Sequence, residues 1–273
     1  MEGATGALAA AGCESARLDA ELLLAEATGW DRAQFAAEPD LRLPVGASRR
    51  FSETVRRRIR REPVAYILGR KGFRRIELIV DRRVLIPRPE TELLVEVALE
   101  LEPQNVLDVG TGSGAIALAV ADELPQSRVV ATDVSFDAVR VAQTNAEHLG
   151  LAERVDVVLR GVDSLGGSEP EGRPFDLLLA NLPYVTEAEW DELAPEIREY
   201  EPRNALVAGT TGLEVIVVLL EELTALAKRP TAVALEVGAG QAVEVSELVS
   251  AAGYTEVEIR TDLAGIDRVV VGR

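Results

Sequence analysis

Short apolar runs alternate with longer amphipathic stretches over the C-terminal part of the chain. The runs with the length and the Val, Ile and Leu content of buried strands are Asn105–Val109, Arg128–Thr132, Val155–Leu159, Phe175–Ala180, Ala232–Val237, Thr255–Ile259 and Arg268–Val271. Helical stretches separate the first six, which predicts a parallel, doubly wound sheet with helices on both faces. Residues 260–267 are too short for a crossover helix, so the seventh strand is predicted to pair antiparallel.

The first part of the chain has helical periodicity instead. Apolar side chains recur with a 3.6-type spacing at Leu18, Leu22, Leu23 and Ala25. Gly29 is predicted to end this helix. A second helix is predicted over residues 47–61, and its apolar face carries Phe51, Val55 and Ile59.

The pattern changes between residues 64 and 92. The run at 76–80 predicts a short strand or hairpin, and Pro87 and Pro89 then bracket Arg88 before another helix opens at Glu90-Thr91-Glu92. We therefore place a domain boundary near residue 85. The prediction is a small N-terminal helical domain, 1–84, followed by an α/β domain, 85–273.

The charge balance narrows the class of partner. The chain has 29 Lys and Arg against 46 Asp and Glu, a formal net charge of −17. Such a chain repels a phosphate backbone, so stable nucleic-acid binding is not expected. One local exception is the arginine run at Arg56, Arg57, Arg58, Arg60 and Arg61. We interpret it as a solvated helix surface, with a contact surface for RNA or an acidic partner as the alternative.

Single cysteine and histidine residues exclude several kinds of site. Cys13 and His148 cannot make a disulfide framework or a Cys/His zinc site, and no metal is predicted. The residues before Cys13 lack the basic and apolar regions of a lipoprotein signal. The longest apolar run, 215–220, is too short to span a bilayer. A cytoplasmic protein is expected.

A glycine-rich loop follows the first predicted strand. It reads Gly110-Thr111-Gly112-Ser113-Gly114 and precedes a helix, where glycines permit a sharp turn and free N–H groups face a ligand. The loop alone fits either NAD or S-adenosylmethionine. Asp108, just before it, would disfavour a pyrophosphate and suits the ammonium group of a methionine moiety. Asp133 after the second strand can accept hydrogen bonds from ribose hydroxyls. Asp163 after the third is either an adenine contact or a plain loop residue.

The tetrapeptide Asn181-Leu182-Pro183-Tyr184 follows the fourth strand, where open α/β sheets bind ligands. By composition alone it could be a simple turn. The chemistry of methyl transfer favours a site, because an amide or aryl amine nitrogen is a poor nucleophile and has to be oriented. The Asn181 side-chain oxygen and the Leu182 carbonyl can accept hydrogen bonds from the two N–H groups of that nitrogen. They would also offset the positive charge that develops on it during methyl transfer. Tyr184 offers a ring face to the planar group.

At these residues the chain resembles the PrmC/HemK family, the peptide chain release factor N5-glutamine methyltransferases. The family signature is Asn-Pro-Pro-Tyr, close to Asn181-Leu182-Pro183-Tyr184. Further matches are Asp19-Ala20-Glu21-Leu22-Leu23-Leu24, Glu62-Pro63-Val64-Ala65-Tyr66-Ile67-Leu68-Gly69, Leu85-Ile86-Pro87-Arg88-Pro89-Glu90-Thr91-Glu92, Tyr200-Glu201-Pro202, Ala205-Leu206, Gly212-Leu213, Leu235-Glu236-Val237-Gly238, Gln241, Asp262-Leu263-Ala264-Gly265 and Asp267-Arg268. The resemblance covers nearly the whole chain.

The resemblance implies a class I, Rossmann-like methyltransferase with an N-terminal domain that docks its substrate. Gly110, Thr111, Gly112, Ser113, Gly114 and Asp133 would bind S-adenosyl-L-methionine, which leaves as S-adenosyl-L-homocysteine. Asn181 would grip the substrate amide beside the methyl donor. The substrate would be the glutamine of a Gly-Gly-Gln motif in bacterial class 1 release factors. Leu182 departs from the family proline, but a position that contributes a carbonyl can tolerate this change.

Three other functions compete with this interpretation. A nucleic-acid adenine-N6 or cytosine-N4 methyltransferase uses a similar tetrapeptide, although the acidic balance counts against it. An NAD-dependent oxidoreductase would need an acid–base partner, and His148 is expected on a helix surface. A non-catalytic cofactor-binding module would not require Asn181. A monomer is expected.

Overall fold

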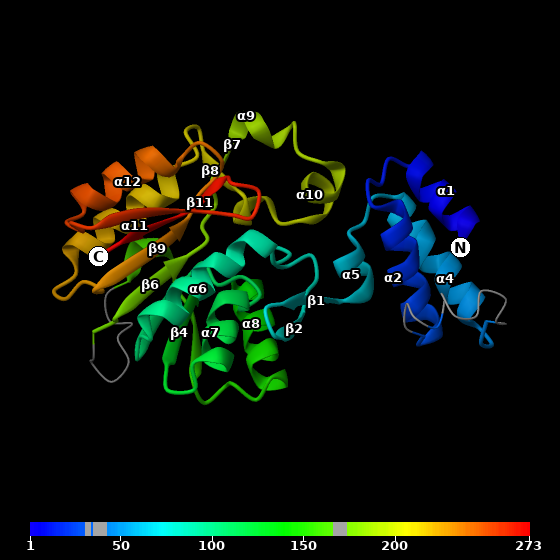
Figure 1. Ribbon diagram of the computed structural model, residues 1–273, viewed down its shortest axis with the longest axis horizontal. Coiled ribbons are helices and arrows are strands. Elements are labelled where there is room, and N and C mark those ends of the chain that lie inside the picture. The colour runs from blue at the N-terminus through cyan, green and yellow to red at the C-terminus, as the bar shows by residue number, and fades with distance from the viewer. Residues whose placement is uncertain (31–33, 35–42, 166–173) are drawn as a thin grey trace. The chain divides into compact units, whose positions relative to one another are not determined.

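The computed structural model describes residues 1–30, 34, 43–165 and 174–273 (Figure 1). The chain folds into two compact units. Unit 1 comprises residues 1–70 and 194–200, and unit 2 comprises residues 71–193 and 201–273. The chain thus passes from unit 1 to unit 2 after residue 70 rather than after the predicted residue 84, and the later segment 194–200 belongs to unit 1.

Unit 1 is helical, as predicted. Its described helices are α1 (Glu2–Ala10), α2 (Ala16–Thr28), α4 (Ala47–Ile59), α5 (Val64–Leu68) and α10 (Pro195–Tyr200). Gly29 ends α2 in a left-handed conformation, φ 75°, which confirms the predicted stop. Two predicted face residues are wrong: Leu18 is 44% exposed and Ile59 38% exposed. The core of these helices combines the small Ala16 and Ala20 with Leu8, Leu23 and Val55.

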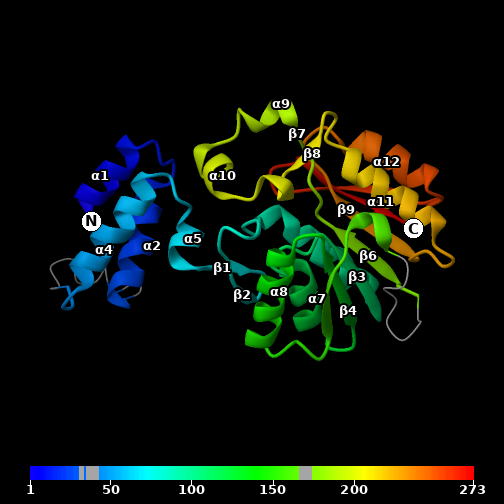
Figure 2. The same cartoon turned by 180° about the vertical axis from the view of Figure 1, so that it is seen from behind.

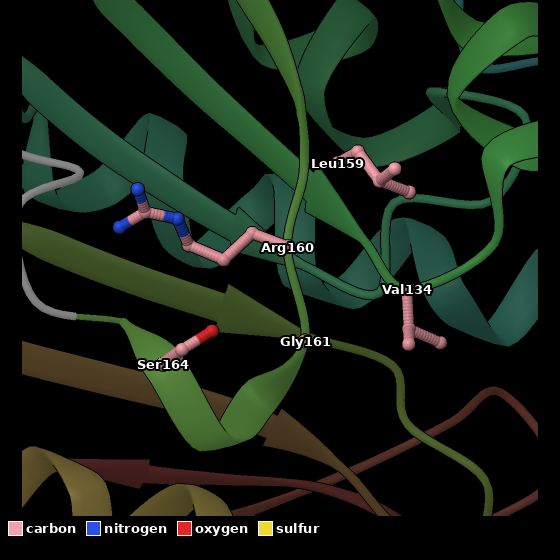
Figure 3. Close-up of a pocket in the computed structure, with 5 residues that line it drawn as sticks. All are labelled: Val134, Leu159, Arg160, Gly161 and Ser164. Atoms are coloured by element: carbon pink, nitrogen blue, oxygen red, sulfur yellow. The ribbon is translucent and has the colours of Figure 1, made fainter.

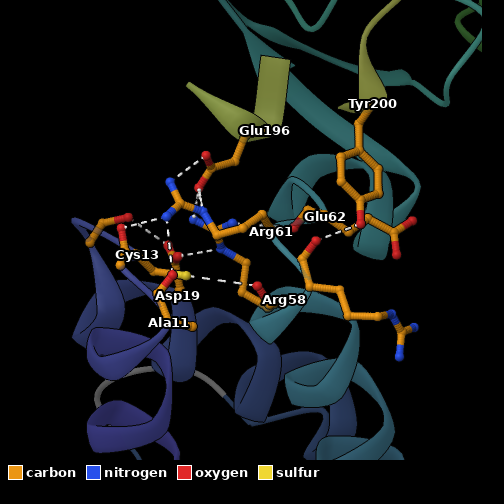
Figure 4. A network of polar contacts seen from close by, with 11 residues as sticks. Ala11, Cys13, Asp19, Arg58, Arg61, Glu62, Glu196 and Tyr200 are labelled. Carbon is orange, nitrogen blue, oxygen red and sulfur yellow. Dashed lines mark hydrogen bonds and ion pairs between the residues drawn. The ribbon is translucent and has the colours of Figure 1, made fainter. Parts of the chain in front are cut away.

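Two members of the arginine run, Arg58 on α4 and Arg61 after it, make ion pairs inside unit 1 (Figure 4). The buried Arg58 donates to Asp19 at 2.7 Å and to Glu196 at 2.9 Å. Arg61 also pairs with Glu196, at 2.5 Å, and Tyr200 donates to the Arg60 carbonyl. These contacts join segment 194–200 to α2 and α4. The interpretation as a solvated surface is therefore wrong for Arg58, because its charge is matched inside the unit.

Unit 2 is built on a seven-stranded sheet with the order β10-β11-β9-β6-β3-β4-β5. The strands are β3 (Asn105–Val109), β4 (Arg128–Asp133), β5 (Val155–Leu159), β6 (Leu177–Ala180), β9 (Ala232–Glu236), β10 (Val257–Thr261) and β11 (Asp267–Gly272). Pairs β3–β4, β3–β6, β4–β5 and β6–β9 are parallel. The last strand, β11, runs antiparallel to both β10 and β9, so the predicted fold class is confirmed.

Helices cover both faces of this sheet (Figures 1 and 2). One face carries α6 (Glu92–Leu101), α7 (Ala115–Glu123) and α8 (Phe136–His148), and the other carries α11 (Glu214–Ala225) and α12 (Ala242–Ala251). Alternate strand residues, such as Leu107 and Leu235, form one core cluster with α11 and α12. This is the two-sided burial expected of a parallel sheet. Among the described residues, no helix is both long and apolar enough to cross a membrane.

β1 (Arg70–Phe73) and β2 (Ile76–Ile79) form a small hairpin, and residues from 71 onward belong to unit 2. The division of the chain therefore comes earlier in the sequence than predicted. The buried Asn145 on α8 accepts from the Ile79 N–H at 2.8 Å. Its amide donates to the Ile79 carbonyl at 3.0 Å and to the Ser113 carbonyl at 2.9 Å. One side chain thereby fixes the hairpin to both the helix and the glycine loop.

Candidate active site

A cavity of about 470 Å³ opens beyond the carboxyl ends of β3, β4 and β6. Seven of the predicted site residues line it: Gly110, Gly112, Asp133, Asp163, Asn181, Leu182 and Pro183. The other predicted residues, Thr111, Ser113, Gly114 and Tyr184, are not part of its lining. Its volume is within the range of small-molecule and cofactor sites. The sheet topology thus gathers segments far apart in the sequence at one edge.

The glycine loop is shaped by backbone conformations that other residues rarely adopt. Gly110, Gly112 and Gly114 have φ of 77°, 57° and 85°. A Cβ on Gly114 would meet Leu118 at 2.8 Å, whereas one on Gly112 would meet nothing within 4 Å. Gly114 is therefore required for packing of α7. Gly112 leaves space on the cavity side.

Asp108 is not part of the cavity lining, and it contacts the glycine loop and α7 instead. It is fully buried, and its Oδ2 accepts from the Thr111 hydroxyl at 2.6 Å and from the Ala117 N–H at 3.2 Å. Its other oxygen has no hydrogen-bond partner among the described residues. Burial raises the pKa of the Asp108 carboxyl to about 7. The proposed pairing of this carboxylate with an ammonium group is thus not supported by its position.

Asp133 lies at the end of β4 and lines the cavity. Its two oxygens accept from the N–H groups of Gly112, at 2.9 Å, and Ser135, at 2.8 Å. Burial raises the pKa of this carboxyl, while the two N–H groups oppose the rise. The carboxylate retains further lone pairs for ligand hydroxyl groups.

An open hollow of about 400 Å³ adjoins the cavity at Val134, Arg160 and Gly161, and Leu159 and Ser164 complete it (Figure 3). Asp163 lies in a short 3-10 turn, Val162–Ser164, at this border. A Cβ on Gly161 would come within 2.6 Å of Asp163 Oδ1. The cavity therefore continues toward a polar wall formed by residues that follow β5.

Asn181 lines the cavity, and one end of its side-chain amide has a partner. Its Nδ2 donates to the buried Thr91 hydroxyl at 3.1 Å, which fixes which end of the amide is free. No donor among the described residues reaches Asn181 Oδ1 or the Leu182 carbonyl. Two acceptors at adjacent positions thus remain available to a ligand. Sequence reasoning missed Thr91, although it stands in the Glu90-Thr91-Glu92 signature.

The rest of the tetrapeptide is fixed by packing. The Leu182 side chain is 3% exposed, and a Cβ on Gly110 would meet its Cδ2 at 3.0 Å. Tyr184 lies outside the cavity, where its carbonyl accepts from Gln241 Nε2 at 3.1 Å. Burial raises the pKa of the Tyr184 hydroxyl to about 12. Leu182 therefore contributes a side chain to the core as well as a carbonyl at the cavity.

A second wall of the cavity comes from two segments whose role the sequence did not reveal. Arg83, Val84 and Leu85 line it from one side, and Pro202, Asn204 and Ala205 line it from another. Glu201 ties these segments together: one oxygen accepts from the Ile86 N–H at 3.0 Å and the other pairs with Arg88. The proline-rich signature and Tyr200-Glu201-Pro202 were the sequence signals for this wall.

Solved structures share the fold of this chain at low sequence identity. The hMettl16 catalytic domain in complex with the MAT2A 3′UTR hairpin 1 matches with a TM-score of 0.58 and 17% identity, covering 71% of this chain and 74% of that one. Human methyltransferase 10 domain containing protein matches with a TM-score of 0.51 and 17% identity, over 71% and 89% of the two chains. These likenesses establish a methyltransferase-type fold.

Comparison with proteins of similar sequence identifies the family of this chain. Residues 1–69 match the PrmC N-terminal domain, and residues 89–207 match the methyltransferase small domain. Proteins named release factor glutamine methyltransferase are 40% identical in Koribacter versatilis (97% of this chain, 94% of the relative) and 41% identical in Moorella thermoacetica (96% and 92%). With both domains matched and identity sustained over nearly its full length, the chain belongs to the release factor glutamine methyltransferase family.

Proposed function

We propose that this chain transfers a methyl group from S-adenosylmethionine to the side-chain amide nitrogen (N5) of a glutamine in a class 1 peptide chain release factor, in its Gly-Gly-Gln motif. The observation that carries the proposal is the pair of free acceptors, Asn181 Oδ1 and the Leu182 carbonyl, at a cavity edged by the glycine loop. Family membership supports both the substrate and the cofactor.

The cavity lining fits S-adenosylmethionine. Gly112 leaves room where a side chain would intrude, and the carboxylate of Asp133, which lines the cavity, would receive hydroxyl groups of a ribose. The Asp163 border offers a polar wall for the base. When bound, this cofactor supplies an electrophilic methyl group, so no metal chemistry is required.

The work of the protein is to orient a weak nucleophile. A glutamine amide shares its nitrogen lone pair with the carbonyl group, so the nitrogen has to be turned toward the methyl donor. Asn181 Oδ1 and the Leu182 carbonyl accept hydrogen bonds from the two N–H groups of the glutamine amide, and they stabilise the positive charge that develops on its nitrogen. Thr91 prevents the Asn181 amide from turning its NH₂ group into the site. The methylated nitrogen is acidic and loses its proton readily, without a strong general base.

Mass spectrometry tests the proposal. A release factor incubated with the chain and S-adenosylmethionine should gain one methyl group on the glutamine of Gly-Gly-Gln, while DNA and RNA in parallel reactions gain none. Methylation of nucleic acid with an unchanged release factor would overturn it and support an adenine-N6 or cytosine-N4 activity.

Variants assign the role of Asn181. Asn181→Ala should lower turnover by about 10²- to 10³-fold, the scale for loss of one preorganised polar contact, with a much smaller change in cofactor affinity. Asn105→Ala is the matched control, because Asn105 lies at the opposite end of β3 from the cavity. Equal turnover in the two variants would remove the proposed role.

We further propose a monomer that acts in the cytoplasm, where release factors work, and that binds its substrate through the N-terminal helices. Light scattering of the purified chain measures the oligomeric state. Within the arginine run, Arg56 on α4 and Arg60 just after it are the exposed arginines left for an acidic partner after the internal ion pairs form.

A further inference from the structure

A buried carboxylate lies beside the tetrapeptide with no assigned role. Glu236 is 1% exposed, and neither of its oxygens has a hydrogen-bond partner among the described residues. A buried, unpartnered carboxylate is costly, and such groups in native structures call for an explanation. Glu236 ends β9, which lies next to the strand that carries the tetrapeptide.

The sheet register brings Glu236 level with Asn181. Ala180 on β6 pairs with Leu235 on β9, so the next residue of each strand stands at the same edge of the sheet. Leu235 faces the core beneath α11 and α12, and by strand alternation Glu236 faces the other side, which α6 covers. Thr91 is the residue that immediately precedes α6. Three elements thus converge on one spot.

The hydrogen bonding of Thr91 is incomplete at this spot. Its hydroxyl oxygen accepts from Asn181 Nδ2, so the hydroxyl proton needs an acceptor of its own. Thr91 is 4% exposed, which leaves little access for bulk water. Burial raises the pKa of the Glu236 carboxyl to about 7, and the Thr91 side chain opposes this rise. Other charges acting there are those of Glu90, Arg268 and Arg88.

We propose that Glu236 is a positioning residue for methyl transfer: its carboxylate accepts a hydrogen bond from the Thr91 hydroxyl, and Thr91 in turn holds the Asn181 amide with its oxygen toward the substrate. The chain of contacts runs from Asn181 Nδ2 to Thr91 Oγ1 to Glu236. Without the last acceptor, the Thr91 hydroxyl loses its fixed direction, and Asn181 can turn its NH₂ group into the site. The inference rests on the proposed function, because Asn181 has to hold the substrate amide.

Matched substitutions separate hydrogen bonding from packing. Thr91→Val and Glu236→Met remove the hydroxyl and its acceptor at similar volume, and each should lower kcat by about 10- to 100-fold, the scale for outer partners of functional groups. Thr91→Ser and Glu236→Gln keep a hydroxyl and an acceptor, so they should retain most of the activity. Glu90→Gln is the control, since it removes a nearby charge outside the chain of contacts. Affinity for S-adenosylhomocysteine should stay unchanged throughout.

A double-mutant cycle gives the decisive result. If the two residues act in series, the double variant Thr91→Val with Glu236→Met should be no slower than the slower single variant. Multiplied losses would show that Glu236 acts independently of Thr91 and would overturn the proposal. Full activity of Thr91→Val or Glu236→Met would also overturn it.

A second readout does not depend on the substrate. The side-chain NH₂ signals of Asn181, identified by their loss in Asn181→Ala, should shift and exchange faster with water in Thr91→Val and Glu236→Met, but not in Glu90→Gln. Unchanged signals would overturn the inference even if the release factor is methylated. The expected signals without any methylation of a release factor would instead overturn the proposed function alone.

Discussion

Replacing Arg58 by Ala should destabilise unit 1 far more than replacing any neighbouring arginine. Arg58 is the central group of the ion-pair network on α4 (Figure 4), and its side chain is 7% exposed. Removing it leaves the Asp19 carboxylate, 6% exposed, without its cation, and a buried pair broken in this way typically costs about 3–5 kcal/mol.

The contacts that remain in Arg58→Ala keep the expected loss of stability near the lower end of this range of about 3–5 kcal/mol. Glu196 keeps two hydrogen bonds from Arg61, at 2.5 and 2.8 Å. Asp19 keeps one from the Ser15 hydroxyl, at 2.7 Å. We therefore expect a loss of about 3 kcal/mol in the free energy of unfolding of unit 1. Arg56→Ala, on the exposed face of the same helix, should change it by less than about 0.5 kcal/mol.

Hydrogen exchange measured by mass spectrometry suits this test, because a global melting curve would mix the two units. Peptides from α2, α4 and segment 194–200 should lose protection in Arg58→Ala, while peptides from the central strands of unit 2 serve as the internal reference. Adding Asp19→Leu to Arg58→Met should restore part of the protection, since the unpaired charge is then gone. Equal protection in Arg58→Ala and Arg56→Ala would refute the reasoning.

Three further outcomes follow from the site. Gly112→Ala should weaken binding of S-adenosylhomocysteine in calorimetry and lower the melting temperature only through its left-handed φ of 57°, whereas Gly114→Ala should lower the melting temperature further because its Cβ would also meet a side chain at 2.8 Å. Leu182→Ala leaves a void beneath the glycine loop and should cost about 2–5 kcal/mol in urea denaturation; a smaller loss would mean that the loop collapses onto it. The folded-state pKa of Asp108 is raised from 3.8 to about 7, so the folded protein holds this proton more tightly, and stability should fall as pH rises through that interval. Asp108→Asn should reduce this slope, and an unchanged slope would exclude Asp108 as its source.

The sheet was largely predictable from sequence, because each strand carries its own signal. The runs at 105–109 and 155–159 have the predicted bounds, and the short link before the last strand identified the antiparallel pair. Helix faces were harder to predict. On α2 the buried face includes Ala16, Ala20 and Leu23, while Leu18 faces outward, because alanines contribute little to an apolar pattern in the sequence.

Site residues were predictable where the local chemistry requires one residue type. They were not predictable where a contact with a distant part of the sequence determines their role. Gly112 and Asn181 follow from local chemistry, and both line the cavity. The partner of Asn181 lies 90 residues earlier in the chain, and no spacing rule links the two. The prediction that Arg58 lies on a solvated surface was wrong for the same reason. Its acceptor Glu196 is 138 residues away in the sequence, so the local pattern showed only a helix rich in arginine.

That separation has a consequence for the protein as it is synthesised. Arg58 leaves the ribosome 138 residues ahead of Glu196. At roughly 5–20 residues per second, the N-terminal helices wait on the order of ten seconds for segment 194–200 to emerge. During that interval Asp19 is the one acidic partner of Arg58, among the residues that the structure describes, that has already been made. The N-terminal unit therefore cannot reach its final form as a nascent domain, and it is completed only after most of the sheet has been translated.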